Sequence, residues 1–538
     1  MNKKKFYIYS LVLFTVFIVI TSSLGLFKIG ILSDTFGDSY TAVNSTALDK
    51  ITNNLEYIDT YRYRPVLFLT LKGIAGINKL TGISYDNFII YKLINIFLYL
   101  LFAFISGFIV LKMTGKAGLS ALTEALILIY PNNLHNLCWS AAYFEILCGI
   151  FYLLAFLFLI RFIGNRVSRF LIFSNILFII ALLTKEIAIV FPFVCMVILY
   201  LVYGKTIFNK FKSIYISQFA ILFSYFISKT FLSRGIPVIS GKYFEGNFVV
   251  NSIQIICKGI IASIIPLDFS VLRIGIKEFN ILQILYLLVV ILFFSVLLYE
   301  LIKQKKKNLI LLIGLNFLIL ISPYIYAGYI RPQLVLIPFT ITLITLVCFI
   351  DIKSFFIKRI VIVFFVFWIF WGYGVIDGWK TAYAEGNERM ENLLKTDLSK
   401  DKKNIVIGNP ARIRQCFMYD NVMFPYNYFK YHNYIIKDTL SDLIRTVALD
   451  DASLNSDLLV NKTNKNEYEI SCTGKTQFFC LDGDESQINK YNGIINEFIS
   501  VEFLEYNNIG KPVKIKTKIL SDNTECFIFQ GKNLIKLN

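Results

Sequence analysis

Residues 86–112 read DNFIIYKLINIFLYLLFAFISGFIVLK, a run of apolar side chains with only a few polar ones. A helix that crosses the hydrocarbon core of a bilayer, about 30 Å thick, needs roughly 20 such residues. The run lacks the strict alternation of apolar and polar residues that marks a half-buried strand. Because lipid offers the backbone no hydrogen-bond partners, only helices and closed barrels cross it. This stretch therefore predicts a membrane-spanning helix.

Stretches of the same kind recur along the chain. Of its 538 residues 56% are hydrophobic and 17% are charged, with a mean hydropathy of +0.62, whereas a soluble domain carries about 25% charged residues. We predict a mainly α-helical, polytopic bundle of about eleven transmembrane helices over residues 1–376, then a small α+β domain over 377–538. The predicted spans are 6–27, 86–112, 117–131, 138–161, 170–184, 187–203, 214–232, 281–302, 309–327, 333–350 and 359–376.

The net charge of +18 raises the question of a nucleic-acid partner, but the distribution of charge argues against one. Lys and Arg gather in every second loop, while the short loops 132–137, 185–186 and 328–332 hold almost none. That alternation is typical of the positive-inside rule. It predicts a cytoplasmic N-terminus and an extracytoplasmic C-terminal domain. The residues that carry the pattern are Lys3, Lys4, Lys5, Lys112, Lys116, Arg161, Arg166, Arg169, Lys205, Lys210, Lys212, Lys303, Lys305, Lys306, Lys307, Lys353, Lys358 and Arg359.

Two segments admit a second interpretation. A basic leader followed by an apolar stretch also fits a cleaved signal peptide over 1–27, although the stretch is long and lacks a clean cleavage site. The weaker apolar stretch 249–266 contains Lys258, and counting it as a span would invert every later loop. We therefore expect an uncleaved anchor at the N-terminus and an interfacial or re-entrant segment at 249–266.

The tail predicts a charged helix followed by short strands. Asn387 to Lys400 has a helical composition, and later runs are rich in β-branched and aromatic residues. The tail also holds Cys416, Cys472, Cys480 and Cys526, for which three pairings are open. The predicted strands are Asn404–Gly408, Glu467–Cys472, Gln477–Leu481, Phe498–Leu504 and Cys526–Gln530.

Chemistry is expected where the first outer loop, 28–85, meets the bundle. Asp34 and Asp38 follow the first span closely, where a carboxylate is placed to act as a general base. Arg62 and Arg64 carry guanidinium groups that suit phosphate or pyrophosphate. The following residues 65–80 read as a helix lying on the membrane surface. The alternative is that the acidic residues cap a helix or face solvent, and that the arginines contact lipid headgroups.

Further ionisable residues lie at membrane depth or at the outer edge. Such residues are costly in lipid and mark functional or paired sites. Lys185 and Glu186 separate two predicted spans, Arg331 ends a third, and Glu145 lies within a fourth. An ordinary turn is the alternative for the Lys-Glu pair, and pairing inside the bundle is the alternative for Glu145 and for Glu124.

These segments, in this order, resemble the GT-C membrane glycosyltransferases of the TMTC-type and protein O-mannosyltransferase-like branch. The run YRYRPVLFLTLKGIAGINKLTG resembles the family's S-Y-R-P motif and its membrane-parallel helix. LSDTFGDSY resembles the acidic Asp-Asp motif, and YPNNLHNLCWSAAYFEILCG resembles the H-P…W-I-S-G-R-x-D-L-L segment. LLTKEIAIVFP resembles the L-L-S-K-E motif, and YIRPQLVLIPF resembles the late Arg-to-Pro motif. The resemblance covers about residues 1–376.

The resemblance implies a bacterial plasma-membrane enzyme that takes a sugar from a polyprenyl-phosphate-linked donor on the outer face. Asp34 then matches the catalytic base, with Asp38 as a possible substitute. Thr35 stands where the family often has a second Asp, so the use of a divalent metal is left open. The acceptor, a protein or an envelope glycan, is not implied. The residues matched to the donor phosphate and substrate are Arg62, Arg64, Glu145, Lys185, Glu186 and Arg331.

Two functions of another class remain open from the sequence. A flippase or transporter of lipid-linked glycans also has many spans and intramembrane charges, but internal repeats and broken helices are its usual marks. An envelope polysaccharide polymerase or ligase shares the carrier and the topology, but not the early acidic loop. The early Asp34 segment, together with the YRYRP run, favours the transferase over both alternatives.

Overall fold

The computed structural model describes the bundle helices, the short elements between them and the strands of the tail. All statements below concern the described residues, which are 2–30, 64–81, 89–139, 142–206, 210–232, 248–264, 281–303, 307–327, 330–349, 355–395, 403–407, 412–413, 416–417, 447–450, 458–472, 477–480, 493–495, 499–506, 512–521, 524–530 and 533–537.

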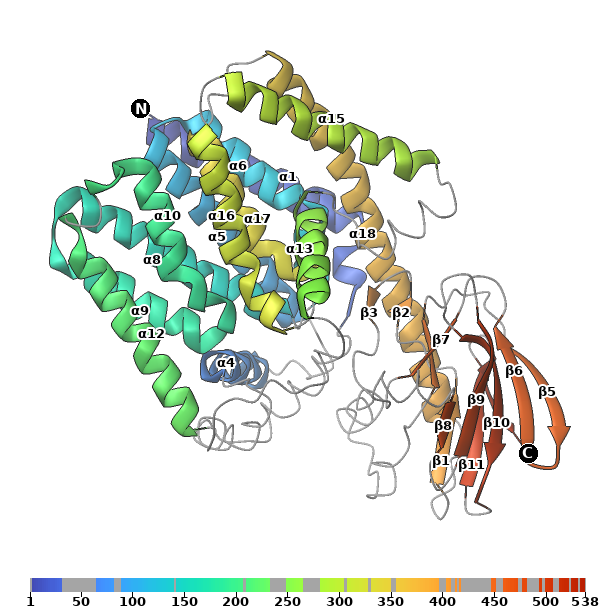
Figure 1. Cartoon of the computed structure of the whole chain (residues 1–538). Helices are drawn as coiled ribbons and strands as arrows, with labels where there is room; N and C mark the ends of the chain where they lie inside the picture. Colours follow the sequence, from blue (N-terminus) through green and yellow to red (C-terminus); the bar gives the residue numbers. More distant parts are fainter. Residues whose placement is uncertain are drawn as a thin grey trace.

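The first part of the chain is a bundle of apolar helices (Figure 1), and each predicted span overlaps one of them. Among the described residues six helical segments are long and apolar enough to cross a membrane: Asn2–Ser23, Ile89–Thr114, Tyr143–Asn165, Glu186–Tyr203, Leu309–Tyr326 and Val361–Arg389. They indicate a multi-pass membrane protein, and the count of eleven spans stays a prediction. The bundle helices are α1 (Asn2–Ser23), α5 (Ile89–Thr114), α6 (Ala117–Ile129), α8 (Tyr143–Asn165), α9 (Ser168–Thr184), α10 (Phe191–Tyr203), α12 (Lys212–Leu232), α15 (Ile281–Lys303), α16 (Lys307–Ala327), α17 (Leu336–Phe349) and α18 (Phe355–Lys395).

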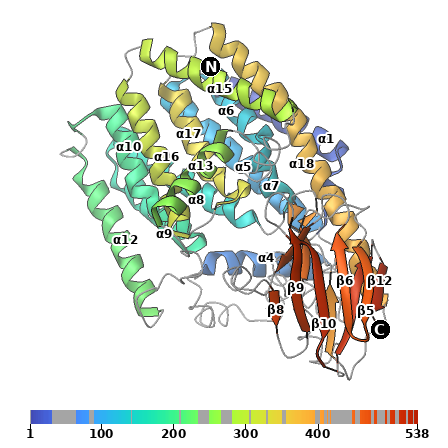
Figure 2. The same ribbon diagram turned by 45° about the vertical axis from the view of Figure 1, so that its right-hand side comes forward.

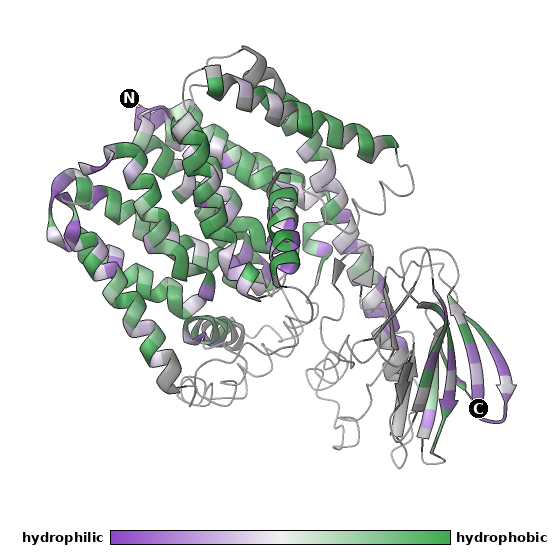
Figure 3. Cartoon of the chain, viewed as in Figure 1, coloured by the Kyte–Doolittle hydropathy of each residue, from purple (hydrophilic) through white to green (hydrophobic). Residues whose placement is uncertain are grey.

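The bundle buries apolar side chains in its centre and also exposes them at its circumference. α5 lies centrally, against α6, α8 and α17, and Tyr99 and Ile109 on it are fully buried. On α1, Leu11 and Val19 are 68% and 62% exposed although they are apolar. Figure 3 shows the apolar colouring over most of the bundle, while polar residues concentrate at helix ends and on the strands. Apolar surface on the outside of a helical bundle is what contact with lipid requires.

Short helices close one end of the bundle. The predicted surface helix 65–80 is α4 (Pro65–Thr81), which runs crosswise to the long helices near the end of α9 (Figure 2). The stretch 249–266 contains α13 (Phe248–Ile264), a helix of 17 residues that packs against α16. Two 3₁₀ turns, η4 (Glu186–Val190) and η6 (Pro332–Val335), precede α10 and α17. A third, η1 (Leu26–Lys28), follows α1.

The segment predicted as the short loop 132–137 is instead a buried helix, α7 (Pro131–Cys138). Its polar sequence suggested a loop, but α5 supplies partners for its last carbonyl groups. Lys92 Nζ donates to the Cys138 carbonyl at 2.9 Å, and Asn95 Nδ2 donates to the Asn136 carbonyl at 2.9 Å. A cation at the C-terminus also suits the negative end of the helix dipole. Tertiary hydrogen bonds therefore replace the water that these groups would need in a loop.

α7 also holds its neighbours through its own side chains. Asn132 Nδ2 donates to the Ala262 carbonyl near the end of α13 at 2.6 Å, and Asn136 Nδ2 donates to the Gln333 carbonyl in η6 at 2.9 Å. Trp379 Nε1 on α18 donates to His135 Nδ1 at 2.9 Å. His135 falls within the predicted loop 132–137, which favours an exposed side chain; that prediction is wrong, because the ring is partly buried against α18.

Several of the basic loops meet at one end of the bundle. Asn2 Nδ2 donates to the Gly115 carbonyl at 2.6 Å, which joins the N-terminus to the loop between α5 and α6. Lys112 lies within reach of the charges of Lys3 and Arg161. Figure 1 places the N-terminus and the C-terminal strands at opposite ends of the bundle. This arrangement agrees with the alternation of basic loops, although the side of the membrane that each end faces stays a prediction.

α18 extends well beyond the predicted span 359–376. It is 41 residues long, and the charged helix expected from Asn387 is its continuation as far as Lys395. Its far part packs against β2, β3 and β12 of the tail. One helix thus leads from the bundle to the C-terminal domain without a break.

The tail forms small sheets, as predicted. The order of the largest is β5-β6-β10-β9-β8, all antiparallel, and β1 pairs in parallel with β11, which pairs with β12. Cys472 and Cys526 are free thiols. The strands are β1 (Lys403–Ile407), β2 (Arg412–Ile413), β3 (Cys416–Phe417), β4 (Val447–Asp450), β5 (Leu458–Asn464), β6 (Glu467–Cys472), β7 (Gln477–Cys480), β8 (Gly493–Ile495), β9 (Ile499–Tyr506), β10 (Pro512–Ile519), β11 (Thr524–Gln530) and β12 (Asn533–Leu537).

Candidate functional site

Arg64 and Glu186 form a two-pronged ion pair at the end of the bundle that α4 closes. Arg64 immediately precedes Pro65, the first residue of α4, and Glu186 opens η4. Arg64 Nη2 donates to Glu186 Oε2 at 2.7 Å, and Arg64 Nε lies 3.2 Å from each carboxylate oxygen. These residues are 122 positions apart in the sequence. The fold therefore presents the flat edge of a guanidinium group to an anion at this end.

Lys185 and Glu145 form a second ion pair, which is more deeply buried. Lys185 lies between α9 and η4 in extended backbone, with φ −159° and ψ 144°, so its side chain leaves the helical path. Glu145 lies in the first turn of α8, where a carboxylate suits the positive end of the helix dipole. Lys185 Nζ contacts Glu145 Oε1, and the two side chains are 8% and 1% exposed. The pairing predicted as the alternative for Glu145 is therefore present.

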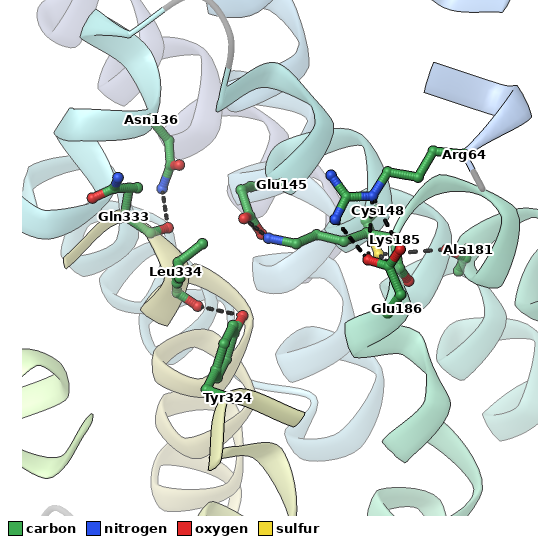
Figure 4. A network of polar contacts seen from close by, with 10 residues as sticks. All are labelled: Arg64, Asn136, Glu145, Cys148, Ala181, Lys185, Glu186, Tyr324, Gln333 and Leu334. Atoms are coloured by element: carbon green, nitrogen blue, oxygen red, sulfur yellow. Dashed lines mark hydrogen bonds and ion pairs between the residues drawn. The ribbon is translucent and has the colours of Figure 1, made fainter. Parts of the chain in front are cut away.

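Phe144 brings the two pairs together. Its ring centroid lies 5.3 Å from the Arg64 guanidinium carbon and 5.0 Å from Lys185 Nζ. Both cations thus lie within the range of a cation–π contact with one ring. Figure 4 shows the two ion pairs near one another, Arg64 with Glu186 and Lys185 with Glu145. Two positive and two negative groups share a small, partly dry volume.

Neighbouring polar contacts hold the backbone around this charge cluster. Cys148 Sγ donates to the carbonyls of Ala181 and Lys185 at 3.7 and 3.9 Å (Figure 4). Tyr143 donates from its hydroxyl to the Leu67 carbonyl of α4 at 3.1 Å. These contacts tie α8 to the break before η4 and to the start of α4, so three elements position the cluster.

Arg331 occupies a local structure that resembles the one at Lys185. Each cation lies in extended backbone immediately before a 3₁₀ turn that continues into an apolar helix. In both segments a Pro-Phe pair follows at the seventh and eighth positions after the cation, as Pro192 and Pro338 show. The resemblance of the two segments is a feature that we did not predict.

Hydrogen bonds hold η6 between two helices of the bundle (Figure 4). The Tyr324 hydroxyl on α16 donates to the Leu334 carbonyl at 2.7 Å, and Asn136 on α7 donates to the Gln333 carbonyl. α16 also packs against η4. The structure therefore brings Arg64, Lys185, Glu186 and Glu145 into one cluster and places Arg331, which is partly buried, at the start of a neighbouring turn.

Three predicted site residues lie outside the described residues: Asp34, Asp38 and Arg62. Within the described ranges, no group of three or more His, Cys, Asp or Glu side chains is arranged to hold a metal ion. The other buried carboxylate singled out from the sequence, Glu124, is apart from the cluster: it accepts a hydrogen bond from Ser10 on α1 at 3.0 Å. This hydrogen bond fits the alternative given for Glu124 in the sequence analysis, which is pairing inside the bundle.

Reasoning from sequence missed Phe144, Tyr143 and Cys148 as parts of the site. All three lie close to Glu145 in the sequence, on the first turns of α8. The one indication in the sequence was that polar and aromatic residues gather in the first two turns of an otherwise apolar span. No known protein-family model matches the chain, and no curated protein matches it.

Proposed function

We propose that this chain is a membrane glycosyltransferase that moves a sugar from a polyprenyl-phosphate-linked donor to an acceptor hydroxyl. The observation that carries the proposal is the convergence of Arg64 and Lys185 on Phe144, at the end of an apolar bundle. A lipid-linked phosphate lies in the membrane and its sugar at the surface, so its binding site must combine fixed cations with apolar helices. The motif order described in the sequence supports the same assignment.

The chemistry follows from these groups. The acceptor oxygen attacks the anomeric carbon, the bond from that carbon to the phosphate oxygen breaks, and the polyprenyl phosphate leaves as an anion. Cations held in a partly dry site stabilise that developing charge better than water does, because they need no reorganisation. Arg64 and Lys185 supply this charge, and Arg331 adds to it from the neighbouring turn.

Asp34 is the proposed general base. It takes the proton from the acceptor hydroxyl as the bond to the anomeric carbon forms, with Asp38 as the residue able to replace it. A single displacement from the face opposite the phosphate inverts the anomeric configuration. The proposed location is the outer face of a bacterial plasma membrane, with the N-terminus in the cytoplasm and the C-terminal domain outside.

The test uses the full chain in lipid nanodiscs, supplied with polyprenyl-phosphate sugars and an extract of envelope acceptors. Mass spectrometry follows the conversion of the donor to free polyprenyl phosphate. The proposal predicts conversion by the wild type and strong loss in Arg64→Gln. Movement of intact donor between leaflets without cleavage would contradict it and favour a transporter.

A further inference from the structure

The guanidinium edge that suits a phosphate is already occupied by a carboxylate of the protein. The Glu186 carboxylate accepts hydrogen bonds from Nε and Nη2 of Arg64, and the shortest of them, from Nη2 to Oε2, is 2.7 Å long. A carboxylate and a phosphate both offer two oxygens at a spacing that matches the same edge of a guanidinium group. An anionic ligand that binds Arg64 in this way therefore needs the place that Glu186 holds.

The two ion pairs of the cluster differ in how easily they open. The side chains of Arg64 and Glu186 are 17% and 25% exposed, whereas those of Lys185 and Glu145 are 8% and 1% exposed. A released carboxylate is costly where water cannot reach it and inexpensive where water can. Glu186 is thus the displaceable carboxylate of the cluster, and Glu145 is the fixed partner that keeps Lys185 in place.

The position of Glu186 also favours exchange. It is the first residue of η4 and follows Lys185, whose backbone is extended, so the Glu186 side chain is anchored at the very start of a helical segment and not in its interior. Rotation of one side chain then frees the guanidinium edge without moving α9 or α10. The Phe144 ring continues to contact both cations during the exchange, because it lies against them on a separate helix, α8.

We propose that Glu186 is an internal competitor of the donor: its carboxylate fills the Arg64 anion site and the phosphate of the bound lipid displaces it. This inference rests on the proposed function for the identity of the anion. Glu186 then sets selectivity for anionic over neutral lipids, because a neutral lipid makes no ion pair with Arg64 to replace the Arg64–Glu186 pair that it would have to break. It also predicts that the protein binds its donor less tightly than Arg64 alone would allow.

The experiment measures binding of a polyprenyl monophosphate to the full chain in phosphatidylcholine nanodiscs. Glu186→Gln keeps the size of the side chain but removes its charge, so it is expected to tighten binding up to about 5-fold, the upper end of the range for a solvent-accessible ion pair. Arg64→Gln is expected to weaken binding at least about 10-fold. In the double variant the gain from Glu186→Gln is expected to vanish, because the competition acts through Arg64.

A matched control is Glu467→Gln in the tail, where a carboxylate pairs with Lys516 and Lys518 far from the cluster. It is expected to leave binding unchanged. Unchanged or weaker binding by Glu186→Gln would overturn the proposal and make Glu186 a residue that merely orients Arg64. Thermal unfolding of each variant shows whether a loss reflects the fold instead of the site.

Two further arms identify the source of the phosphate. If added inorganic phosphate removes the tighter binding that Glu186→Gln gives, the exchange stands and the anion is a free phosphate. If phosphatidylglycerol in the nanodisc removes it, the exchange stands and the anion is a lipid headgroup. Tighter phosphate binding by Glu186→Gln, together with no sugar transfer by the wild type, would support the exchange and contradict the proposed function. Failure of all variants and of the wild type to bind any of these phosphates would contradict the exchange itself.

Discussion

At the residue scale, the candidate site is built from two ion pairs, Arg64 with Glu186 and Lys185 with Glu145, whose cations share the Phe144 ring. Arg64, Lys185, Glu186 and Glu145 all stand out as ionisable groups beside or within apolar spans. Nothing in their spacing says that Arg64 meets Glu186 or that Lys185 turns inward to Glu145, because both pairings join distant segments. The aromatic ring between the cations was equally hidden, since Phe144 reads as one more apolar residue of a span.

The buried pair makes a stability prediction. Lys185→Met leaves the Glu145 carboxylate in an apolar site without its cation, and breaking a buried ion pair from one side costs about 3–5 kcal/mol. We expect a clear fall in the unfolding temperature of the full chain in detergent. Lys185→Met combined with Glu145→Gln removes both charges and is expected to recover most of the loss. A double variant as unstable as Lys185→Met would show that the pairing contributes little.

The exposed pair makes a binding prediction. Arg64→Lys keeps the positive charge but replaces the planar group with a single ammonium, which cannot offer two parallel N–H groups. We expect binding of polyprenyl monophosphate to weaken almost as much as in Arg64→Gln, with little change in unfolding temperature, because the Arg64–Glu186 pair is partly exposed. Full binding by Arg64→Lys would mean that charge alone, and not the shape of the guanidinium group, holds the anion.

At the element scale, long and strongly apolar helices were predicted well and short elements were not. The span over 86–112 is α5, and the surface helix at 65–80 is α4. α7 was missed because its asparagines favour loops in isolation, and only the carbonyl partners on α5 make the helix stable. β10 was missed although its sequence, PVKIKTKI, alternates β-branched residues with Lys514, Lys516 and Lys518, which is the pattern typical of a half-buried strand.

The largest sheet makes a pH prediction. Hydrogen bonds from Asn464, Lys518 and Lys516 lower the pKa of Glu467 from 4.5 to about 2. Its charged form is therefore favoured in the folded sheet, and the stability that it contributes is present above about pH 4.5 and is lost as the pH falls towards 2. Hydrogen exchange of the full chain should show β6 and β10 losing protection over that range.

Two variants test this assignment. Glu467→Gln should remove that part of the acid sensitivity of β6 and β10 while lowering their protection at neutral pH. Glu525→Gln, which breaks the ion pair with Lys536 between β11 and β12, serves as the matched control on another sheet. Equal acid sensitivity in the wild type and in Glu467→Gln would show that another group governs the loss.

At the scale of the whole molecule, the division into an apolar bundle and a polar domain with strands could be read from composition alone. The sequence also placed basic residues in alternate loops, and contacts such as that of Asn2 with Gly115 bring several of these loops to one end. It could not show that a single helix, α18, continues from the last span into the tail, because a change from apolar to charged residues reads as the end of an element.

The orientation of the molecule is open to a direct test. We expect a reporter enzyme that works only in the cytoplasm to be silent when fused after Asn538, because the basic loops assign the opposite end of the bundle to the cytoplasm. A fusion within the basic loop near Lys205 should be active and serves as the control. Cytoplasmic activity at the C-terminus would mean that the number of crossings differs by one from the prediction.

The most direct test of the account is single-turnover transfer from a polyprenyl-phosphate sugar by the full chain, compared among the wild type, Asp34→Asn and Asp38→Asn. We expect a product of inverted anomeric configuration, and a rate for Asp34→Asn that is lower by about 10²–10⁴-fold, the usual cost of losing a general base, while binding of the donor persists. Loss in Asp38→Asn alone would move the role of base to Asp38. Undiminished transfer by both variants, or retention of configuration, would contradict the mechanism.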